Sequence, residues 1–227
     1  MTKKSYNQYC ALARGLDLVG DRWTLLVVRD LLLGPMRYGD LAAGLPGIST
    51  NMLADRLRAL ESAGIVARAT LPPPAGSAVY QLTETGEALE PVLLALGRWG
   101  ARFLGKPEDE DVFVPRSYFV AIRARFRPED AADTRITWEL RIGSQVYEVR
   151  VADRRCTTRQ GAALNPDVVM SMDEETLNAL LIERQPWRRA RKEGRLRVLQ
   201  GDDTSVERFF ELFGTPMWVR SGDRVAG

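Results

Sequence analysis

Residues 37–63 read RYGDLAAGLPGISTNMLADRLRALESA, and they contain two short helical patterns on either side of Pro46-Gly47. Proline and glycine favour a tight turn, and the polar run Ser49-Thr50-Asn51 that follows is typical of the start of a helix. A short helix, a turn that contains glycine and a longer helix come in the order of a helix-turn-helix. The stretch therefore predicts this motif, with its second helix running to about residue 63.

The second predicted helix has an apolar face and a polar face. A step of 100° per residue places its leucines on one side and its short polar side chains on the other. Small polar or amide side chains in the first turn of such a helix reach base edges in the major groove, and an arginine further along reaches a base or a phosphate. The leucines are Leu53, Leu57 and Leu60, and the outward residues are Asn51, Asp55, Arg58 and Ser62.

We expect DNA contacts from three neighbouring elements. Arg37, at the start of the first helix of the motif, is placed to contact a phosphate, and Arg68, in a following strand, to reach the adjacent groove or phosphates. Asp55 must either accept a hydrogen bond from a base amine or pair with a neighbouring arginine, and the sequence leaves these alternatives open. The alternative to DNA binding is that the polar face of the second helix is simply a solvated surface. The predicted DNA-binding residues are Arg37, Ser49, Thr50, Asn51, Asp55, Arg58 and Arg68.

The segments on both sides of the motif extend it to a winged helix. Helical spacing predicts two helices before it, over residues 9–19 and 23–33. After it, residues 65–71 and 78–82 have the pattern of two strands around a proline-rich turn, which is the predicted wing. Thr83 is expected to cap a last helix, whose apolar stripe consists of Leu89, Leu93, Leu96, Trp99 and Phe103.

The composition excludes most catalytic schemes. The 227 residues include no histidine, which removes the commonest general base and a common metal ligand. The two cysteines, Cys10 and Cys156, form no CxxC motif, which fits a reducing compartment. No apolar stretch approaches the roughly 20 residues of a membrane span. We therefore expect a cytoplasmic protein that is not an enzyme, needs no metal or cofactor and has no membrane partner.

An acidic stretch divides the chain. Gly105 and Pro107 stand beside four successive acids, Glu108-Asp109-Glu110-Asp111, and such a segment buries little apolar surface. We predict a first domain over residues 1–105, a linker over 106–112 and a second domain over 113–227.

In the second domain strands come first and helices follow, an α+β pattern. Alternation predicts strands over residues 118–126, 136–142, 145–151 and 155–159, then over 167–172 and 195–199. Helices are expected after Asp173, around residues 187–192 and over residues 205–213.

Several motifs of the first domain occur together in one family. They are Cys10 with the helix after it, Gly20-Asp21-Arg22-Trp23-Thr24-Leu25-Leu26, Arg37-Tyr38-Gly39-Asp40-Leu41, Gly47-Ile48-Ser49 with Leu53, Arg56-Leu57-Arg58-Ala59-Leu60-Glu61, and Val79-Tyr80-Gln81-Leu82-Thr83 with Gly86. Residues 9–105 resemble the HxlR-type winged helix-turn-helix regulators, relatives of the MarR group. The resemblance implies a homodimer, built from the first and last helices, that binds a roughly palindromic operator in double-stranded DNA. The apolar stripe of the last helix agrees with a buried interface.

The second domain carries weaker motifs of another family. They are Asp167-Val168-Val169-Met170-Ser171, Asp173 with Thr176-Leu177, and Gly194-Arg195-Leu196-Arg197-Val198 with Gly201-Asp202. The domain resembles the sterol-carrier-protein-2 type. This implies a five-stranded sheet covered by helices, with an apolar tunnel for a lipid-like effector; the alternative is a filled core. Candidate lining residues are Trp138, Leu140, Trp187, Phe209, Phe213 and Trp218.

The sequence thus favours a repressor-type, sequence-specific DNA-binding regulator with an apolar effector. One alternative is a carrier of hydrophobic ligands whose winged helix mediates protein contacts. Another is a regulator that senses oxidants through Cys10, because some similar regulators use a cysteine at the matching position; such a thiol needs exposure, and a buried apolar role is the opposing interpretation. The basic run at residues 184–192 could touch DNA or an acidic ligand group, or form a solvated face.

Overall fold

The computed structural model describes residues 5–72, 76–104, 110–131, 133–183 and 185–213. Its contacts divide the chain into two compact units, Met1–Leu93 and Leu94–Gly227. The predicted linker lies partly outside the described residues, so its bounds stay a prediction. Within the described residues no helix has the length and apolar character to cross a membrane.

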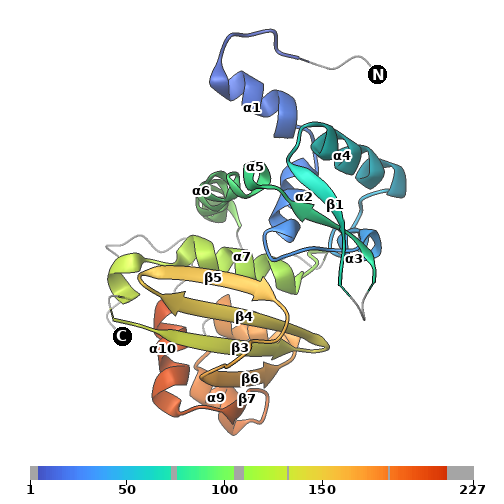
Figure 1. The fold of residues 1–227 in the computed structure, drawn as a ribbon. Helices are drawn as coiled ribbons and strands as arrows, with labels where there is room; N and C mark the ends of the chain where they lie inside the picture. Colours follow the sequence, from blue (N-terminus) through green and yellow to red (C-terminus); the bar gives the residue numbers. More distant parts are fainter. Residues whose placement is uncertain (1–4, 73–75, 105–109, 132, 184, 214–227) are drawn as a thin grey trace. The chain divides into compact units, whose positions relative to one another are not determined.

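The first unit is mainly helical and carries one hairpin (Figure 1). The helices and strands predicted around the helix-turn-helix are confirmed within a few residues. The last predicted helix is divided, because Pro91 has no N–H to continue a helix from the preceding turn and instead occupies the first turn of a new one. The elements are α1 (Ala11–Val19), α2 (Thr24–Leu31), α3 (Tyr38–Ala43), α4 (Thr50–Ser62), β1 (Val66–Thr70), β2 (Ala78–Leu82), α5 (Glu84–Glu87) and α6 (Glu90–Gly100), which crosses the unit boundary and is followed by the 3-10 turn η1 (Ala101–Phe103).

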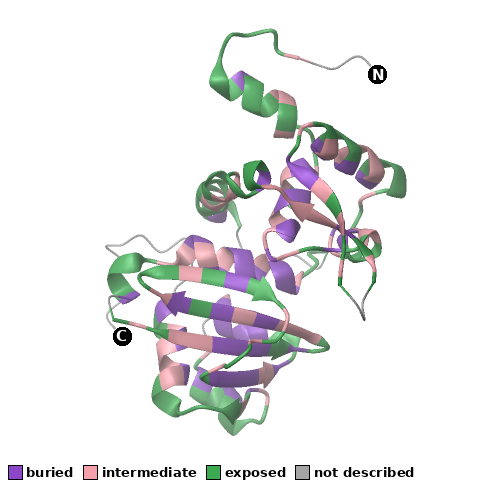
Figure 2. Ribbon diagram, in the orientation of Figure 1, coloured by how far each residue is buried: buried purple, intermediate pink, exposed green. Residues whose placement is uncertain are grey.

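The core of the first unit lies between α2, α3, α4 and the hairpin. Leu53, Leu57 and Leu60 are at most 1% exposed, so α4 turns its leucines inward as predicted. Val27, Val28 and Leu31 of α2 and Leu41 of α3 belong to the same cluster. The polar side of α4 is consequently its outer side (Figure 2).

The hairpin is regular and gains a third partner. β1 and β2 are antiparallel, with Val66 opposite Leu82 and Thr70 opposite Ala78. Met36, in the loop before α3, exchanges two backbone hydrogen bonds with Tyr80, at N–O distances of 2.9 and 2.8 Å. The sequence showed no sign of this bridge, which ties the start of α3 to the wing.

The second unit is an α+β domain around one five-stranded sheet, with strand order β5-β4-β3-β6-β7. β3 and β6 are parallel and the other neighbours antiparallel. The elements are α7 (Pro115–Arg125), the 3-10 turn η2 (Pro128–Ala131), β3 (Ile136–Ile142), β4 (Gln145–Ala152), β5 (Arg155–Gln160), β6 (Val168–Met172), α8 (Glu174–Leu181), α9 (Trp187–Lys192), β7 (Arg197–Gln200) and α10 (Asp203–Phe213).

The strand predicted over residues 118–126 is wrong, because this segment belongs to helix α7. The apolar residues at 118, 120 and 122 suggested alternation, but Pro115 occupies the first turn of a helix, where its fixed φ fits well. Most residues of α7 are buried, Val120 and Ala124 as well as Tyr118, Phe119 and Ile122, so the burial pattern by itself does not distinguish a helix from a strand there. The sheet therefore has five strands, as the family resemblance implied, and not the six that alternation suggested.

One face of the sheet is covered by helices. Trp138, Leu140 and Ile142 of β3 are fully buried, and Trp138 contacts Phe209 of α10 with 5.6 Å between ring centroids. Phe119 of α7 stacks on Tyr147 of β4 at 3.9 Å. The alternate residues point to the opposite face, where many side chains are exposed or half-buried (Figure 2), although Glu139 and Val169 at its centre are buried.

Candidate nucleic-acid interface

Local contacts set the position of α4. The Ser49 hydroxyl accepts a hydrogen bond from the Met52 N–H at 3.3 Å and so caps the helix. The Tyr38 hydroxyl of α3 donates to the Thr50 carbonyl at 2.7 Å. Gly47, in the turn between the two helices, has a φ of +85°, a conformation that glycine adopts without strain. These contacts hold α3, the turn and α4 in one helix-turn-helix.

The predicted reading face is exposed along α4. Asn51 and Arg58 are exposed, and Asp55 between them is partly so. Thr50 is also exposed at the start of the helix, whereas the Ser49 hydroxyl is already engaged as the cap. The structure therefore brings Asn51, Asp55 and Arg58 to one outer line.

Asp55 forms an ion pair with Arg58, one turn further along α4. Arg58 also donates from Nε to the Ala54 carbonyl at 3.4 Å. Of the two roles that the sequence left open for Asp55, the structure without DNA shows the pairing with arginine. The pair is exposed to solvent, where such contacts are weak, so Arg58 can exchange its partner for a phosphate or a base at low cost.

Arg68 of β1 forms an ion pair with Glu61, the penultimate residue of α4. Its Nε lies 2.8 Å and its Nη2 3.3 Å from the two carboxylate oxygens, and its guanidinium lies 5.4 Å from the ring centre of Tyr80. The hydrogen bond that Arg68 donates to Glu61 is the main cause that raises the pKa of Arg68. This arginine therefore links the wing to α4, and its charge is already matched by a carboxylate.

Arg37 differs from these arginines. It stands immediately before α3, is exposed, and has no ion-pair partner among the residues that the structure describes. An unpaired exposed guanidinium is suited to a phosphate, because no protein contact must break first.

The sequence did not indicate two contacts made by the turn between α1 and α2, one with α4 and one with the core. Arg56 forms an ion pair with Asp21, which lies in the turn between α1 and α2. Trp23 has a φ of +77°, an uncommon conformation for a bulky residue, and its side chain packs against the core. Asp21 and Trp23 belong to the Gly20-Asp21-Arg22-Trp23 motif, which is one of the stretches that resemble the HxlR-type regulators. The motif joins the α1–α2 turn to the helix that carries the polar face.

Cys10 is exposed and occupies the position before the first residue of α1. The interpretation of this residue as a buried apolar side chain is therefore wrong for the single chain. Exposure meets one requirement of a sensor thiol, and the sensing role itself stays a prediction.

The proposed ligand-lining residues that the structure describes are buried, and Trp138, Phe209 and Phe213 among them contact one another. Trp138 lies edge-on to Phe209 and Phe213, at 5.6 and 6.1 Å between ring centroids. Both indole N–H groups are used: Trp138 donates to the Ser205 carbonyl and Trp187 to Glu207, each at 3.0 Å. Leu140 is fully buried, and Trp218 lies outside the described residues. Such contacts are those of a packed core, so a ligand space stays a prediction.

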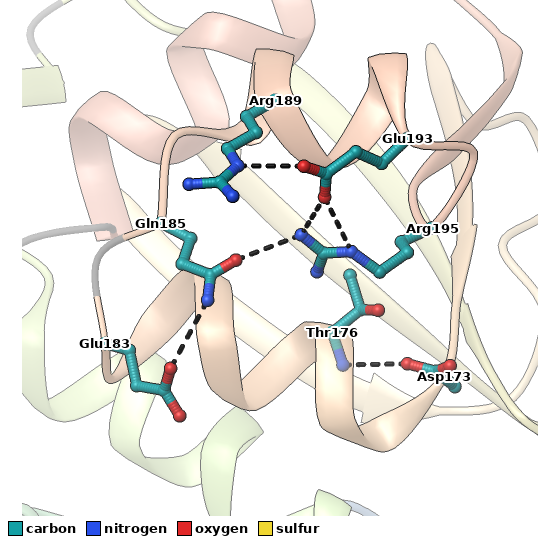
Figure 3. Close-up of polar contacts among 7 residues, drawn as sticks. All are labelled: Asp173, Thr176, Glu183, Gln185, Arg189, Glu193 and Arg195. Atoms are coloured by element: carbon teal, nitrogen blue, oxygen red, sulfur yellow. Dashed lines mark hydrogen bonds and ion pairs between the residues drawn. The ribbon is translucent and has the colours of Figure 1, made fainter.

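The basic run of α9 is neutralised by carboxylates. Arg189 donates to Glu193 at 2.8 Å, and Glu193 also accepts from Arg195 at 3.0 Å (Figure 3). The hydrogen bond from Arg189 is the main cause that lowers the pKa of Glu193. Arg188 and Arg191 pair with Glu207 and Asp203. This surface is a network of ion pairs rather than a free cationic patch.

The sequence also showed no sign of a half-buried arginine that joins helix ends in the second unit. Arg125, at the end of α7, donates from Nη1 to the carbonyls of Leu181 and Phe213, at 3.4 and 3.3 Å. These carbonyls belong to the last residues of α8 and α10, where the helix dipole favours a positive charge. Burial lowers the pKa of Arg125 to about 10. The arginine thus serves to join three helix ends.

Comparison with known proteins matches residues 18–108 to the description "HxlR-like helix-turn-helix". An uncharacterized HTH-type transcriptional regulator of Synechocystis is 39% identical over 95 residues, which are 42% of this chain and 70% of that protein. The HTH-type transcriptional regulator YodB of Bacillus subtilis is 40% identical over 87 residues, 38% of this chain and 78% of the relative. The solved structure of reduced YodB is 34% identical, with a TM-score of 0.38, and covers 44% of this chain and all of that one. By its first unit, the chain belongs to the HxlR-like helix-turn-helix family.

Proposed function

We propose that the chain is a sequence-specific DNA-binding transcriptional regulator that places α4 in the major groove. The observation that carries the proposal is the outer line of Asn51, Asp55 and Arg58 on a helix whose leucines are buried. An amide in the first turn suits a base edge, and an arginine one turn or more further along suits a base or phosphate. Family membership supports the same conclusion.

The regulator is proposed to act as a homodimer on a palindromic operator, in the manner of a repressor. Apolar residues on α1 and on α6 support this, since each helix exposes large side chains that a monomer would leave in water. In α1 these include Leu12 at 72% exposure, and in α6 Trp99 at 57%. A symmetric pair of reading helices matches two half-sites about one helical turn apart.

Fluorescence anisotropy with the DNA upstream of the protein's own gene tests the proposal. Asn51→Ala and Arg58→Ala are expected to weaken specific binding by about 1–3 kcal/mol, because each removes a contact to the duplex. Arg189→Ala is a matched control: the Arg58 and Arg189 side chains are both 69% exposed, and each pairs with an acid about one helical turn away in the sequence. Equal affinities of the wild type and both α4 variants would exclude α4 as the recognition helix.

We further propose that the second unit is of the sterol-carrier-protein-2 type and receives an apolar effector. The five-stranded sheet with helices on one face, and an interior rich in aromatic side chains, support this assignment. Displacement of a fluorescent fatty acid, and native mass spectrometry of protein purified from cells, test it. A unit that binds no such ligand would be a structural domain, and a ligand-binding protein without operator affinity would instead be a carrier.

A further inference from the structure

The face of the second-unit sheet opposite the helices is a separate surface, which is covered at its centre, where Glu139 and Val169 are buried. It carries the alternate residues of each strand, among them Arg141 of β3, Arg150 of β4 and Arg155 of β5. The register places Arg150 opposite Thr157, and Arg197 of β7 opposite Ser171. Figure 1 shows this face toward the viewer, with α9 and α10 behind the strands.

The acids of this face are already engaged. Glu139 accepts from Arg141 at 2.8 Å and, with its other oxygen, from the Ala163 N–H at 3.0 Å. Glu148 accepts from Arg159 at 2.7 Å. Glu139 and Glu148 would therefore have to give up one of these hydrogen bonds before they could pair with another arginine of this face.

Three arginines remain without a partner. Arg150, Arg155 and Arg197 are exposed, and none of them has an ion pair or a side-chain hydrogen bond within the described parts of the chain. We call these three residues the arginine face. Strands lie about 4.8 Å apart and rise about 3.3 Å per residue, and the register offsets Arg155 and Arg197 by about six residues along the strands, so these two arginines lie roughly 28 Å apart on the diagonal of the sheet. The arginine face thus spreads positive charge from one end of β4 and β5 to the opposite end of β7.

We propose that the arginine face binds the phosphate backbone of duplex DNA next to the site that α4 reads. The inference rests on the proposed function, since a duplex bound by α4 would be a polyanion held by the same chain that carries this face. Guanidinium groups bind phosphates with paired hydrogen bonds. A phosphate backbone matches these residues better than an apolar partner would, because the unpaired groups of the face are guanidinium groups. A tethered second contact of this kind strengthens binding by effective concentration.

The test compares two duplexes, one that spans only the operator and one extended by random sequence on both sides. The full-length chain with Arg150→Gln, Arg155→Gln and Arg197→Gln is measured at several salt concentrations. The control carries Arg188→Gln, Arg189→Gln and Arg191→Gln, which removes the same charge from arginines that have carboxylate partners. Each phosphate contact adds about 0.9 to the slope of log K against log salt, so the slope on the long duplex is expected to fall by about 2 to 3 in the arginine-face variant only.

Any of four results would overturn the proposal. Equal slopes for the wild type and the arginine-face variant on the long duplex would show that the face makes no DNA contact, even if specific binding through α4 persists. An equal loss in the α9 control would show a nonspecific charge effect. Unchanged DNA binding together with lost binding to polyglutamate would assign the face to an acidic protein. If the wild type bound no DNA at all, the proposed function would fail first, and this inference with it.

Discussion

Gly86→Ala is expected to destabilise the first unit through one close contact. A Cβ at this position would stand 2.2 Å from the Ile65 carbonyl oxygen, whereas ordinary contacts begin at 3.4 Å. The same oxygen accepts a hydrogen bond from the Thr83 N–H at 3.0 Å. Moving the backbone apart therefore strains the junction between α5 and β1 and breaks this hydrogen bond.

The cost can be worked out from these two effects. Overpacking of a tight site costs about 1–3 kcal/mol, and a lost hydrogen bond about 0.5–1.5 kcal/mol. We expect a loss of about 2–4 kcal/mol in the free energy of unfolding, which is a large part of the stability of a small domain.

Urea denaturation measures this loss, and hydrogen exchange of the β1 peptide assigns it to the first unit. Gly15→Ala is the matched control: this glycine lies within α1, and a Cβ there meets nothing within 4 Å. It should stabilise the chain by about 0.5–1 kcal/mol, because alanine favours a helix interior. If Gly86→Ala is as stable as the wild type, α5 does not approach Ile65 as described.

Three further predictions concern the core, a helix cap and a thiol. Leu57→Ala should lower the free energy of unfolding by about 2–5 kcal/mol, while Asn51→Ala changes it by less than about 0.5 kcal/mol; equal losses in urea denaturation would contradict the assignment of the two faces of α4. Asp173 accepts from the Thr176 N–H at 2.7 Å, and hydrogen bonds with Thr176 lower the pKa of the carboxyl. The cap should therefore contribute about 1 kcal/mol above the ordinary pKa of about 3.9 and lose this contribution as the pH falls through the lowered value, so denaturation of Asp173→Ala should approach the wild type only in acid. For Cys10, diamide should release the operator from the wild type and not from Cys10→Ser; release from both in a gel-shift assay would exclude the sensor role.

Most of the fold was predictable from periodicity. The leucine spacing of α4 and the clean alternation of β3 are strong signals, because each leaves one face polar and the other buried. In α7 the pattern failed, since nearly every residue from Pro115 to Ala124 is buried and a helix buried on most sides shows no clear period. Helix position could only have been inferred there from Pro115.

The candidate site was predictable in position and not in its ion pairs. The outward face of α4 follows from its period, but the partner of Arg68 is Glu61, seven residues away, and the partner of Arg56 is Asp21, 35 residues away. In each pair the two residues lie in different elements, so the period of a single helix or strand cannot predict their contact. Only the folded structure reveals such pairs. The same holds for the arginine face, whose members are recognised by the partners that they lack among the described residues.

The bridge between Met36 and Tyr80 closes a triangle of cross-links. Its other two sides are the hydrogen bond from Tyr38 to Thr50 and the clamp of Arg68 on Glu61. The segment from Met36 through α3, α4 and the hairpin is thus linked in pairs, so bending one of these elements against another breaks a contact. In the proposed dimer we therefore expect an effector to change the spacing between the two winged helices rather than the shape of either one.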